Sequence, residues 1–477
     1  MDMTRASAKD ILDELSTRRL SAADLMRVTL DRIAEVNGQV NAIVALQGED
    51  DLMAAARKSD AAPLCGPLQG LPIAVKDLVN VAGIPSTQGS PIFKDHIPQA
   101  DDLLAARLRA AGAILIGKTN TPEFGLGSHT FNPVYGATRN PYDPARSCGG
   151  SSGGAAVALA TGMLALADGS DMMGSLRNPA AWNNVYGFRP SWGRVPSEPE
   201  GDSYLHQLST LGPMARSPED IGILLDVMSG PDPRVPLSVD ASRVSPVNAA
   251  DLKDMRIGWL GDWGGAFPCE AGILKLCRDA LDAFESRGAR VDTLAPPFDA
   301  ELIWKSWITL RSWSVATGLE PVAARQDVLK DTARWELERG LAFSAMDVHR
   351  ASVIRSDWHR RAAELFEDYD ALVLPAAQVW PFEIEKPYPT EILGQGMDTY
   401  HRWMQVVTPV SLLGLPCLGA PVGFGAEGLP MGLQLFGPRG SDARLLSMGA
   451  AYHAETHWPQ KRPAMKRNRP GGENEYG

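Results

Sequence analysis

Three separated stretches of the chain hold residues that could carry out acyl-transfer chemistry. Lys76 directly follows the apolar run LPIAV, and serines lie in the runs GGSSGG at 149–154 and GSDMMGSLRNPA at 169–180. A serine hydroxyl is a poor nucleophile unless a neighbouring base removes its proton during attack. A lysine with its ordinary pKa of about 10.4 is charged at neutral pH, but burial lowers that pKa. Because LPIAV is typical of a buried strand, Lys76 is a candidate for an uncharged base.

Each of these residues also has a purely structural explanation. Lys76 could form an ion pair with Asp77, although adjacent residues of a strand point to opposite faces. Ser151 and Ser152 could belong to a polar, glycine-rich turn or an anion-binding nest. The letters GGSSG also match the nucleophile elbow of α/β-hydrolases, with Ser151 as nucleophile. That elbow needs a preceding strand, and a proline-punctuated loop stands there instead.

Two further patterns match the letters of a ligand-binding motif but lack the structural features that such a motif needs. GAILIGKT at 112–119 matches a phosphate-binding loop, but its four intervening residues are apolar and Pro122 follows. A buried strand that ends at Gly117 is predicted instead. His453 and His457 have a spacing that can bind zinc, but the order H-E-x-x-H is absent. We therefore expect no metal ion and no cofactor.

The elements that must position these residues begin with two helices. Ser7 with Asp10, and Ser21 with Asp24, form S-x-x-D pairs that are start signals for helices. The run LPIAV, bounded by glycine and proline, then predicts a buried strand directly before Lys76.

The rest of the chain continues the alternation of predicted helices and strands that is typical of an α/β protein. An acid-started helix is predicted over 101–111 and a buried strand over the run AILIG, and a proline-rich loop follows over 120–150. Patterns between about 200 and 400 are longer and more helical. Short apolar runs at 405–437 predict further strands of the same sheet, and a last helix starts at Ser441.

Composition bounds the class of protein. The 477 residues are 44% hydrophobic and carry a formal net charge of −11, so a large core is predicted and a nucleic-acid partner is disfavoured. Five scattered cysteines without C-x-x-C spacing indicate reduced thiols and a cytoplasmic location. The start of the sequence does not resemble a secretory signal. The longest apolar run, at 155–167, is too short to span a bilayer, so no membrane contact is expected.

Taken together, the motifs resemble the amidase signature family of Ser-Ser-Lys hydrolases. The resemblance is strong over 65–195, through GLPIAVKD, GKTNTPEFG, GATRNPYD, GGSSGGAAVALATG and GSDMMGSLRNPA. It implies an α/β fold: one large domain with a mixed, mostly central β-sheet flanked by helices on both faces. The domain is expected over 1–460, with a signature core at 65–195, a variable substrate-shaping region at about 200–400 and a polar tail at 461–477.

The resemblance also implies roles for individual residues. Lys76 is the base, Ser151 relays the proton from within a cis peptide, and Ser175 is the nucleophile. Ser152, Asp171 and Arg177 are expected to support this triad.

The oxyanion hole implied by the resemblance consists of backbone N–H groups just before and at the nucleophile. These belong to Met172, Met173, Gly174 and Ser175. The family usually has glycine where Met173 stands. Because the donors are backbone groups, this departure is expected to affect substrate preference more than catalysis.

The expected activity is amide hydrolysis on small carboxamides, with aryl or alkyl amides, esters or carbamates as substrates. Trp304 and Trp307 share a helical face and could line an acyl pocket, or they could be core. The alternative is the glutaminase-type A subunit of a tRNA-dependent amidotransferase. This is disfavoured because TPEF stands at 121–124 in place of M-D-E-F, and Met404 in place of an acid. The sequence leaves open whether the protein forms a homodimer.

Overall fold

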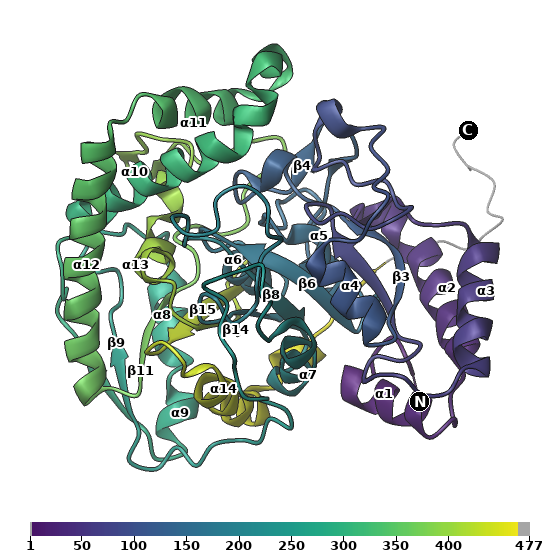
Figure 1. Ribbon diagram of the computed structural model, residues 1–477. Helices are drawn as coiled ribbons and strands as arrows, with labels where there is room; N and C mark the ends of the chain where they lie inside the picture. Colours follow the sequence, from purple (N-terminus) through teal and green to yellow (C-terminus); the bar gives the residue numbers. More distant parts are fainter. Residues whose placement is uncertain (1, 466–477) are drawn as a thin grey trace, which may run out of the picture.

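The computed structural model describes residues 2–465, which fold around two β-sheets of unequal size (Figure 1). The strands are β1 (Ile43–Val44), β2 (Pro72–Lys76), β3 (Ile114–Thr119), β4 (Phe131–Asn132), β5 (Gly136–Ala137), β6 (Leu166–Asp171), β7 (Tyr186–Arg189), β8 (Thr210–Ala215), β9 (Arg256–Trp259), β10 (Arg290–Thr293), β11 (Ala371–Pro375), β12 (Glu391–Ile392), β13 (Gln395–Gly396), β14 (Cys417–Phe424) and β15 (Pro430–Phe436). The larger sheet has eight strands in the order β10-β9-β11-β15-β14-β7-β8-β6, and the smaller has three in the order β1-β3-β2. The short strands β4 and β5, and β12 and β13, form two separate two-stranded sheets.

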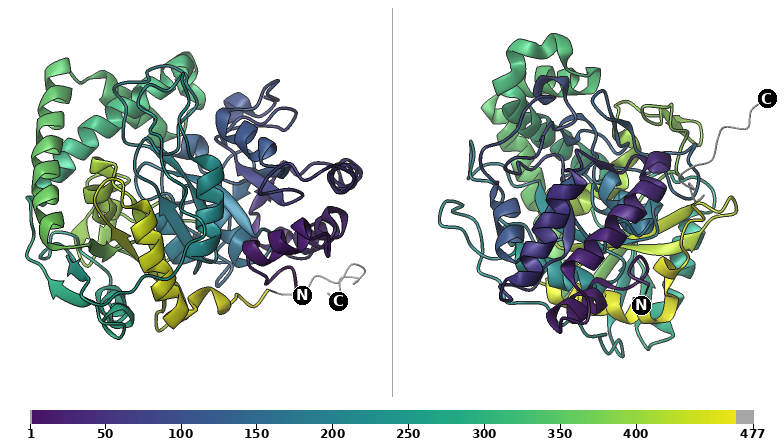
Figure 2. Two further views of the ribbon diagram at one scale, coloured as in Figure 1. Left: turned by 60° about the horizontal axis from the view of Figure 1, so that its bottom comes forward. Right: turned by 90° about the vertical axis from the view of Figure 1, so that its right-hand side faces the viewer.

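Helices surround both sheets. They are α1 (Ala8–Ser16), α2 (Ala22–Val40), α3 (Glu49–Ala61), α4 (Leu103–Ala110), α5 (Gly153–Ala160), α6 (Arg177–Trp182), α7 (Pro218–Met228), α8 (Ile273–Asp279), α9 (Asp282–Glu285), α10 (Ala300–Leu319), α11 (Asp331–Leu341), α12 (Ala345–Asp368), α13 (Thr408–Leu413) and α14 (Asp442–Thr456). The helices α10, α11 and α12 form one end of the molecule, and α1, α2 and α3 form the other (Figures 1 and 2).

The large sheet is mixed and lies between helices. Its β10, β9 and β11 run parallel to one another, and the remaining neighbours pair antiparallel. Successive residues of β14 show the two covered faces: a Cβ at Gly419 would meet Arg177 of α6, whereas Leu418 packs against Gly449 of α14. Because neighbouring residues of a strand point to opposite faces, α6 and α14 cover opposite sides of the sheet. The α/β class with helices on both faces is therefore confirmed.

The two N-terminal helices start where the sequence predicts. The backbone N–H of Asp10 donates to Ser7 Oγ at 3.0 Å, and that of Asp24 donates to Ser21 Oγ at 2.9 Å. Each bond satisfies one of the N–H groups that a helix start leaves without a partner, so both serines are N-caps.

The prediction that residues 405–437 extend the same sheet as LPIAV and AILIG is wrong. Strands β14 and β15 belong to the large sheet, whereas β2 and β3 pair parallel in the small one, and β3 runs two residues past Gly117. The boundary lies where β2 contacts β6. There the backbone N–H of Lys76 donates to the side-chain carboxylate of Asp168 at 3.1 Å. In a continuous sheet, this N–H would donate to a backbone carbonyl of the neighbouring strand instead.

None of the helices within residues 2–465 combines the length and the apolar character that crossing a bilayer requires. In the same part of the chain, no three or more His, Cys, Asp and Glu side chains gather where they could hold a metal ion.

Candidate active site

Lys76 is the last residue of β2 and lies in the interior with 1% of its surface exposed. Its Nζ contacts three hydroxyl groups: Ser151 Oγ at 2.7 Å, Ser152 Oγ at 2.9 Å and Ser170 Oγ at 3.0 Å. The amine and the GGSSGG run therefore meet although they are far apart in the sequence.

The environment of Lys76 favours the uncharged amine. Burial lowers its pKa to about 7, because water no longer stabilises the ammonium form. The carboxylates of Asp168 and Asp171 act in the opposite direction but do not offset the burial. Near neutral pH, a substantial fraction of Lys76 is thus able to accept a proton.

Asp77 points away from Lys76, as the alternation of a strand predicts. Its carboxylate accepts hydrogen bonds from the backbone N–H of Thr87 at 2.9 Å and from the Thr87 hydroxyl at 2.6 Å. It also lies 3.8 Å from Nζ of Lys118, the lysine of the GAILIGKT pattern. Lys118 is fully buried and donates to the carbonyl of Val79, so it lies in the interior and not in a phosphate-binding loop.

The loop that carries Ser151 is packed too closely for larger residues. The peptide bond between Gly150 and Ser151 is cis, as the resemblance implies. A Cβ at Gly153, the first residue of α5, would lie 2.2 Å from Thr130 Oγ1, so this position requires glycine. Burial raises the pKa of the neighbouring Cys148 thiol to about 12, which keeps it protonated and unsuited to nucleophilic attack.

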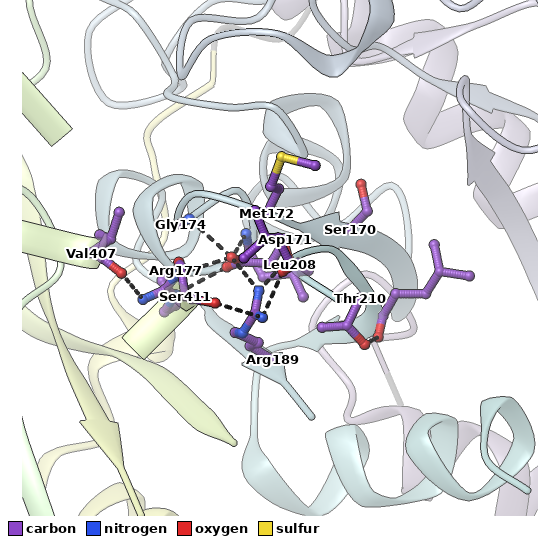
Figure 3. Close-up of polar contacts among 12 residues, drawn as sticks. Ser170, Asp171, Met172, Gly174, Arg177, Arg189, Leu208, Thr210, Val407 and Ser411 are labelled. Atoms are coloured by element: carbon purple, nitrogen blue, oxygen red, sulfur yellow. Dashed lines mark hydrogen bonds and ion pairs between the residues drawn. The ribbon is translucent and has the colours of Figure 1, made fainter. Parts of the chain in front are cut away.

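Asp171 organises the turn between β6 and α6 (Figure 3). Its carboxylate accepts hydrogen bonds from the backbone N–H groups of Gly174 at 2.9 Å and Leu176 at 3.1 Å. It also accepts two from the Arg177 guanidinium, at 3.0 and 2.9 Å, and lies 3.1 Å from Arg189 Nη1. Burial alone would raise the pKa of Asp171, but the two guanidinium groups outweigh it and hold the pKa well below its usual range.

Replacing Asp171 with asparagine is expected to destabilise the folded chain by about 3 to 5 kcal/mol, because two buried guanidinium groups lose their counter-charge. Since folding lowers the pKa of Asp171, its contribution to stability is present above about pH 4 and is lost as the pH falls further into the acid range. Thermal unfolding of both proteins as a function of pH measures this effect.

The matched control is Asp279→Asn, which breaks an exposed i, i+4 pair with Lys275 and should change stability by less than about 0.5 kcal/mol. Equal stability of Asp171→Asn and the wild type would contradict the assignment of Asp171 as the anchor of this turn.

Ser175 lies within that turn and lines a cavity. It is 8% exposed, and its backbone carbonyl accepts a hydrogen bond from the N–H of Ser152 at 3.2 Å, which joins the two serine loops. Across residues 2–465, the Ser175 hydroxyl has no hydrogen-bond partner. The structure thus brings Ser151 to Lys76, and it leaves Ser175 Oγ open to the cavity without a bond to Ser151. Such contacts are often long in free enzymes and shorten when substrate binds.

Only three of the four predicted oxyanion donors are available. The N–H of Gly174 is donated to Asp171, whereas those of Met172, Met173 and Ser175 have no acceptor in the part of the chain that the structure describes. The sequence does not reveal this difference, because it depends on where the Asp171 carboxylate lies.

The cavity at Ser175 has a volume of about 270 Å³. Its wall consists of signature-loop residues, a loop before them and one face of α10. They are Leu78, Gln88, Phe124, Gly125, Leu126, Gly127, Ser128, Ser151, Ser170, Met172, Met173, Ser175, Ser209, Arg311, Val315, Gly318, Leu319 and Met404. The wall is mixed: eight of these residues have apolar side chains, and seven, most of them serines, have polar ones. Concave sites that combine apolar side chains with polar groups are typical of small-ligand sites.

Trp304 and Trp307 of α10 belong to the core, one of the two interpretations that the sequence left open. Trp307 is fully buried, and Trp304 packs against the ring of His401 at 5.3 Å and under the Arg402 guanidinium at 4.6 Å. Neither lines the cavity. The helix lines the cavity through Arg311, Val315, Gly318 and Leu319 instead, and no sequence motif indicates Arg311.

Ser170 and Asp168 are also absent from the predicted site. They are alternate residues of β6, so their side chains share the face that meets Lys76. The sequence does contain a signal for these two residues: they stand two positions apart in a strand, directly before Asp171, so their side chains must point to the same face.

Comparison with known proteins agrees with this geometry. The family model described as "Amidase" matches residues 24–446. An acylamidase from Rhodococcus erythropolis is 32% identical over 96% of this chain and 97% of its own length. The A subunit of a glutamyl-tRNA(Gln) amidotransferase from Saccharolobus solfataricus is 30% identical over 94% of this chain and 96% of its own.

Solved structures give the same result. A bacterial aryl acylamidase of the amidase signature family superposes with a TM-score of 0.89 at 25% identity, over 96% of this chain and 99% of that one. A 6-aminohexanoate cyclic dimer hydrolase superposes with a TM-score of 0.87 at 25% identity, over 97% and 99%. The chain belongs to the amidase signature family. It is an amide-hydrolysing enzyme.

Proposed function

We propose that this enzyme hydrolyses small, uncharged carboxamides through an acyl-enzyme on Ser175, with Lys76 as base and Ser151 as proton relay. The observation that carries the proposal is the contact of 2.7 Å between the buried Lys76 Nζ and Ser151 Oγ, at the wall of the cavity that Ser175 lines. The small volume of that cavity supports a small substrate.

The reaction follows from these positions. Ser175 Oγ attacks the amide carbonyl carbon while its proton passes through Ser151 to the uncharged Nζ of Lys76. The N–H groups of Met172, Met173 and Ser175 donate to the carbonyl oxygen as it gains negative charge. The C–N bond then breaks, and the amine leaves with the proton returned through the same path.

Water completes the cycle by attacking the acyl-enzyme ester. The same base takes a proton from that water, the acid leaves, and Ser175 regains its hydroxyl. Esters and carbamates enter the cycle equally, because their leaving groups need only protonation.

The alternative, a glutaminase-type A subunit, is supported by the similarity to the amidotransferase chain from Saccharolobus solfataricus. The cavity lining opposes it. Glutamine carries an ammonium group, and among the described residues no carboxylate lines this cavity; Met404 lies in its wall instead. Turnover of acetanilide but not of glutamine by the purified single chain would separate the two functions.

Treatment with phenylmethylsulfonyl fluoride tests the nucleophile. The intact wild-type chain is expected to gain the mass of one phenylmethylsulfonyl group, because Ser175 Oγ is open to the cavity. The Ser175→Ala variant should gain none. An unchanged wild-type mass would instead indicate a non-catalytic binding protein on this fold.

A further inference from the structure

Arg311 is the only charged side chain that lines the cavity at Ser175, within the described residues. It lies on α10, and only 5% of its side chain is exposed. A buried charge must be paired and hydrogen-bonded to be tolerated, so the contacts of this guanidinium show which of its N–H groups are satisfied.

Two sides of the guanidinium are firmly held. Its Nε donates to Glu336 Oε1 at 2.9 Å, and its Nη2 donates to the Tyr400 hydroxyl at 2.7 Å. Glu336 also accepts hydrogen bonds from Tyr400 at 2.8 Å and from Ser312 at 2.6 Å. These bonds keep the guanidinium plane in one orientation and neutralise its charge from behind the cavity wall.

The third side is poorly satisfied. Nη1 carries two hydrogens, and its partner is the thioether sulfur of Met172 at 3.2 Å. A thioether is a weak acceptor, whereas a guanidinium N–H forms strong bonds to oxygen. Met172 lines the same cavity, and a methionine side chain has three rotatable bonds, so it can yield this position to a better acceptor.

We propose that Arg311 Nη1 selects amide substrates that carry a second, neutral oxygen acceptor, such as a ketone or amide carbonyl, on the part that lies against α10. This inference rests on the proposed function. The acceptor is neutral because Glu336 already balances the charge of Arg311. A carboxylate would bring an excess negative charge into a cavity that offers no unpaired cation among its lining residues.

Matched substrate pairs test this selectivity. On the acyl side, levulinic anilide carries a ketone that pentanoic anilide lacks, and succinanilic acid carries a carboxylate. On the amine side, para-acetonyl acetanilide is compared with para-propyl acetanilide. We expect kcat/KM to favour the ketone in at least one pair by about 10-fold to 100-fold, as for a hydrogen bond to a charged donor. The carboxylate should be the poorest of the acyl series.

Variants assign the preference to Arg311. The double variant Arg311→Met with Glu336→Gln removes the guanidinium without leaving a buried charge alone, and its ketone-to-alkyl ratio should approach 1. Arg311→Lys keeps the charge but not the second N–H arm, and its ratio should also fall. The control Lys305→Met removes an exposed cation from the same helix and should keep the wild-type ratio. A purely structural role would lower all substrates equally and leave the ratio unchanged.

Two results would overturn the inference: a wild-type ratio near 1 in both pairs with anilides still hydrolysed, or a preference for the carboxylate. Neither depends on the folding of a variant. Failure of the proposed function has a different signature, namely no hydrolysis of any anilide. In that event, calorimetric binding of the same pairs to Ser175→Ala decides the selectivity, and equal affinities within a pair would reject it.

Discussion

Ser175→Ala is expected to lower kcat/KM for an anilide by about ten-thousand-fold or more, because removing the proposed nucleophile leaves only binding and oxyanion stabilisation. The Ser175 hydroxyl has no hydrogen-bond partner within residues 2–465, so its loss should leave packing and stability nearly unchanged. Steady-state kinetics and thermal unfolding of the same preparation measure both effects.

The matched control for that variant is Ser352→Ala, an exposed serine on α12, which should keep wild-type kinetics. If Ser175→Ala still hydrolysed amides at a tenth of the wild-type rate or faster, the nucleophile would have to be another hydroxyl of the cavity. Ser151 and Ser170 would then be the residues to replace next, since both lie at Lys76.

The second large effect concerns Lys76, the proposed base. Lys76→Met is expected to lower kcat/KM by about 10²-fold to 10⁴-fold, the usual contribution of a positioned general base. In the wild type, protonation of Lys76 removes the base. Because its pKa is about 7, kcat/KM should fall about tenfold per pH unit below pH 7 and level off above it.

In the variant Lys76→Met, kcat/KM should no longer fall below pH 7. The control Lys58→Met, on the exposed side of α3, should keep the wild-type dependence of kcat/KM on pH. A limb centred near pH 4 in the wild-type enzyme would point to a carboxylate as the base and would reject Lys76.

Local patterns were enough to predict the elements that do not depend on distant partners. The N-caps at Ser7 and Ser21 follow from a hydroxyl three residues before a backbone N–H, and the orientation of Lys76 away from the Asp77 side follows from the alternation of β2. The division into two sheets was not predictable. At their boundary the backbone N–H of Lys76 donates to the carboxylate of Asp168, a contact between residues that no local pattern relates.

The site shows the same distinction. Motifs led to Lys76, Ser151 and Ser175, but the fate of the Gly174 N–H depends on a carboxylate that folds back on its own turn. Arg311 lies outside every motif. Its spacing of four and eight residues from Val315 and Leu319 marks one face of α10, but only the fold shows that this face lines the cavity.

The anchoring of Asp171 has a consequence for the energetics of turnover. Through Arg177, the turn that carries Ser175 is tied to Ser411 at 2.6 Å and to Gln434 at 2.6 Å, on α13 and β15. Because these bonds join groups of the protein itself, the backbone N–H groups of the turn are oriented when the polypeptide folds. In the proposed mechanism, these groups donate to the carbonyl oxygen as it gains negative charge. Little free energy is then needed to rearrange these groups during the reaction, so the entropy of activation should be only slightly unfavourable.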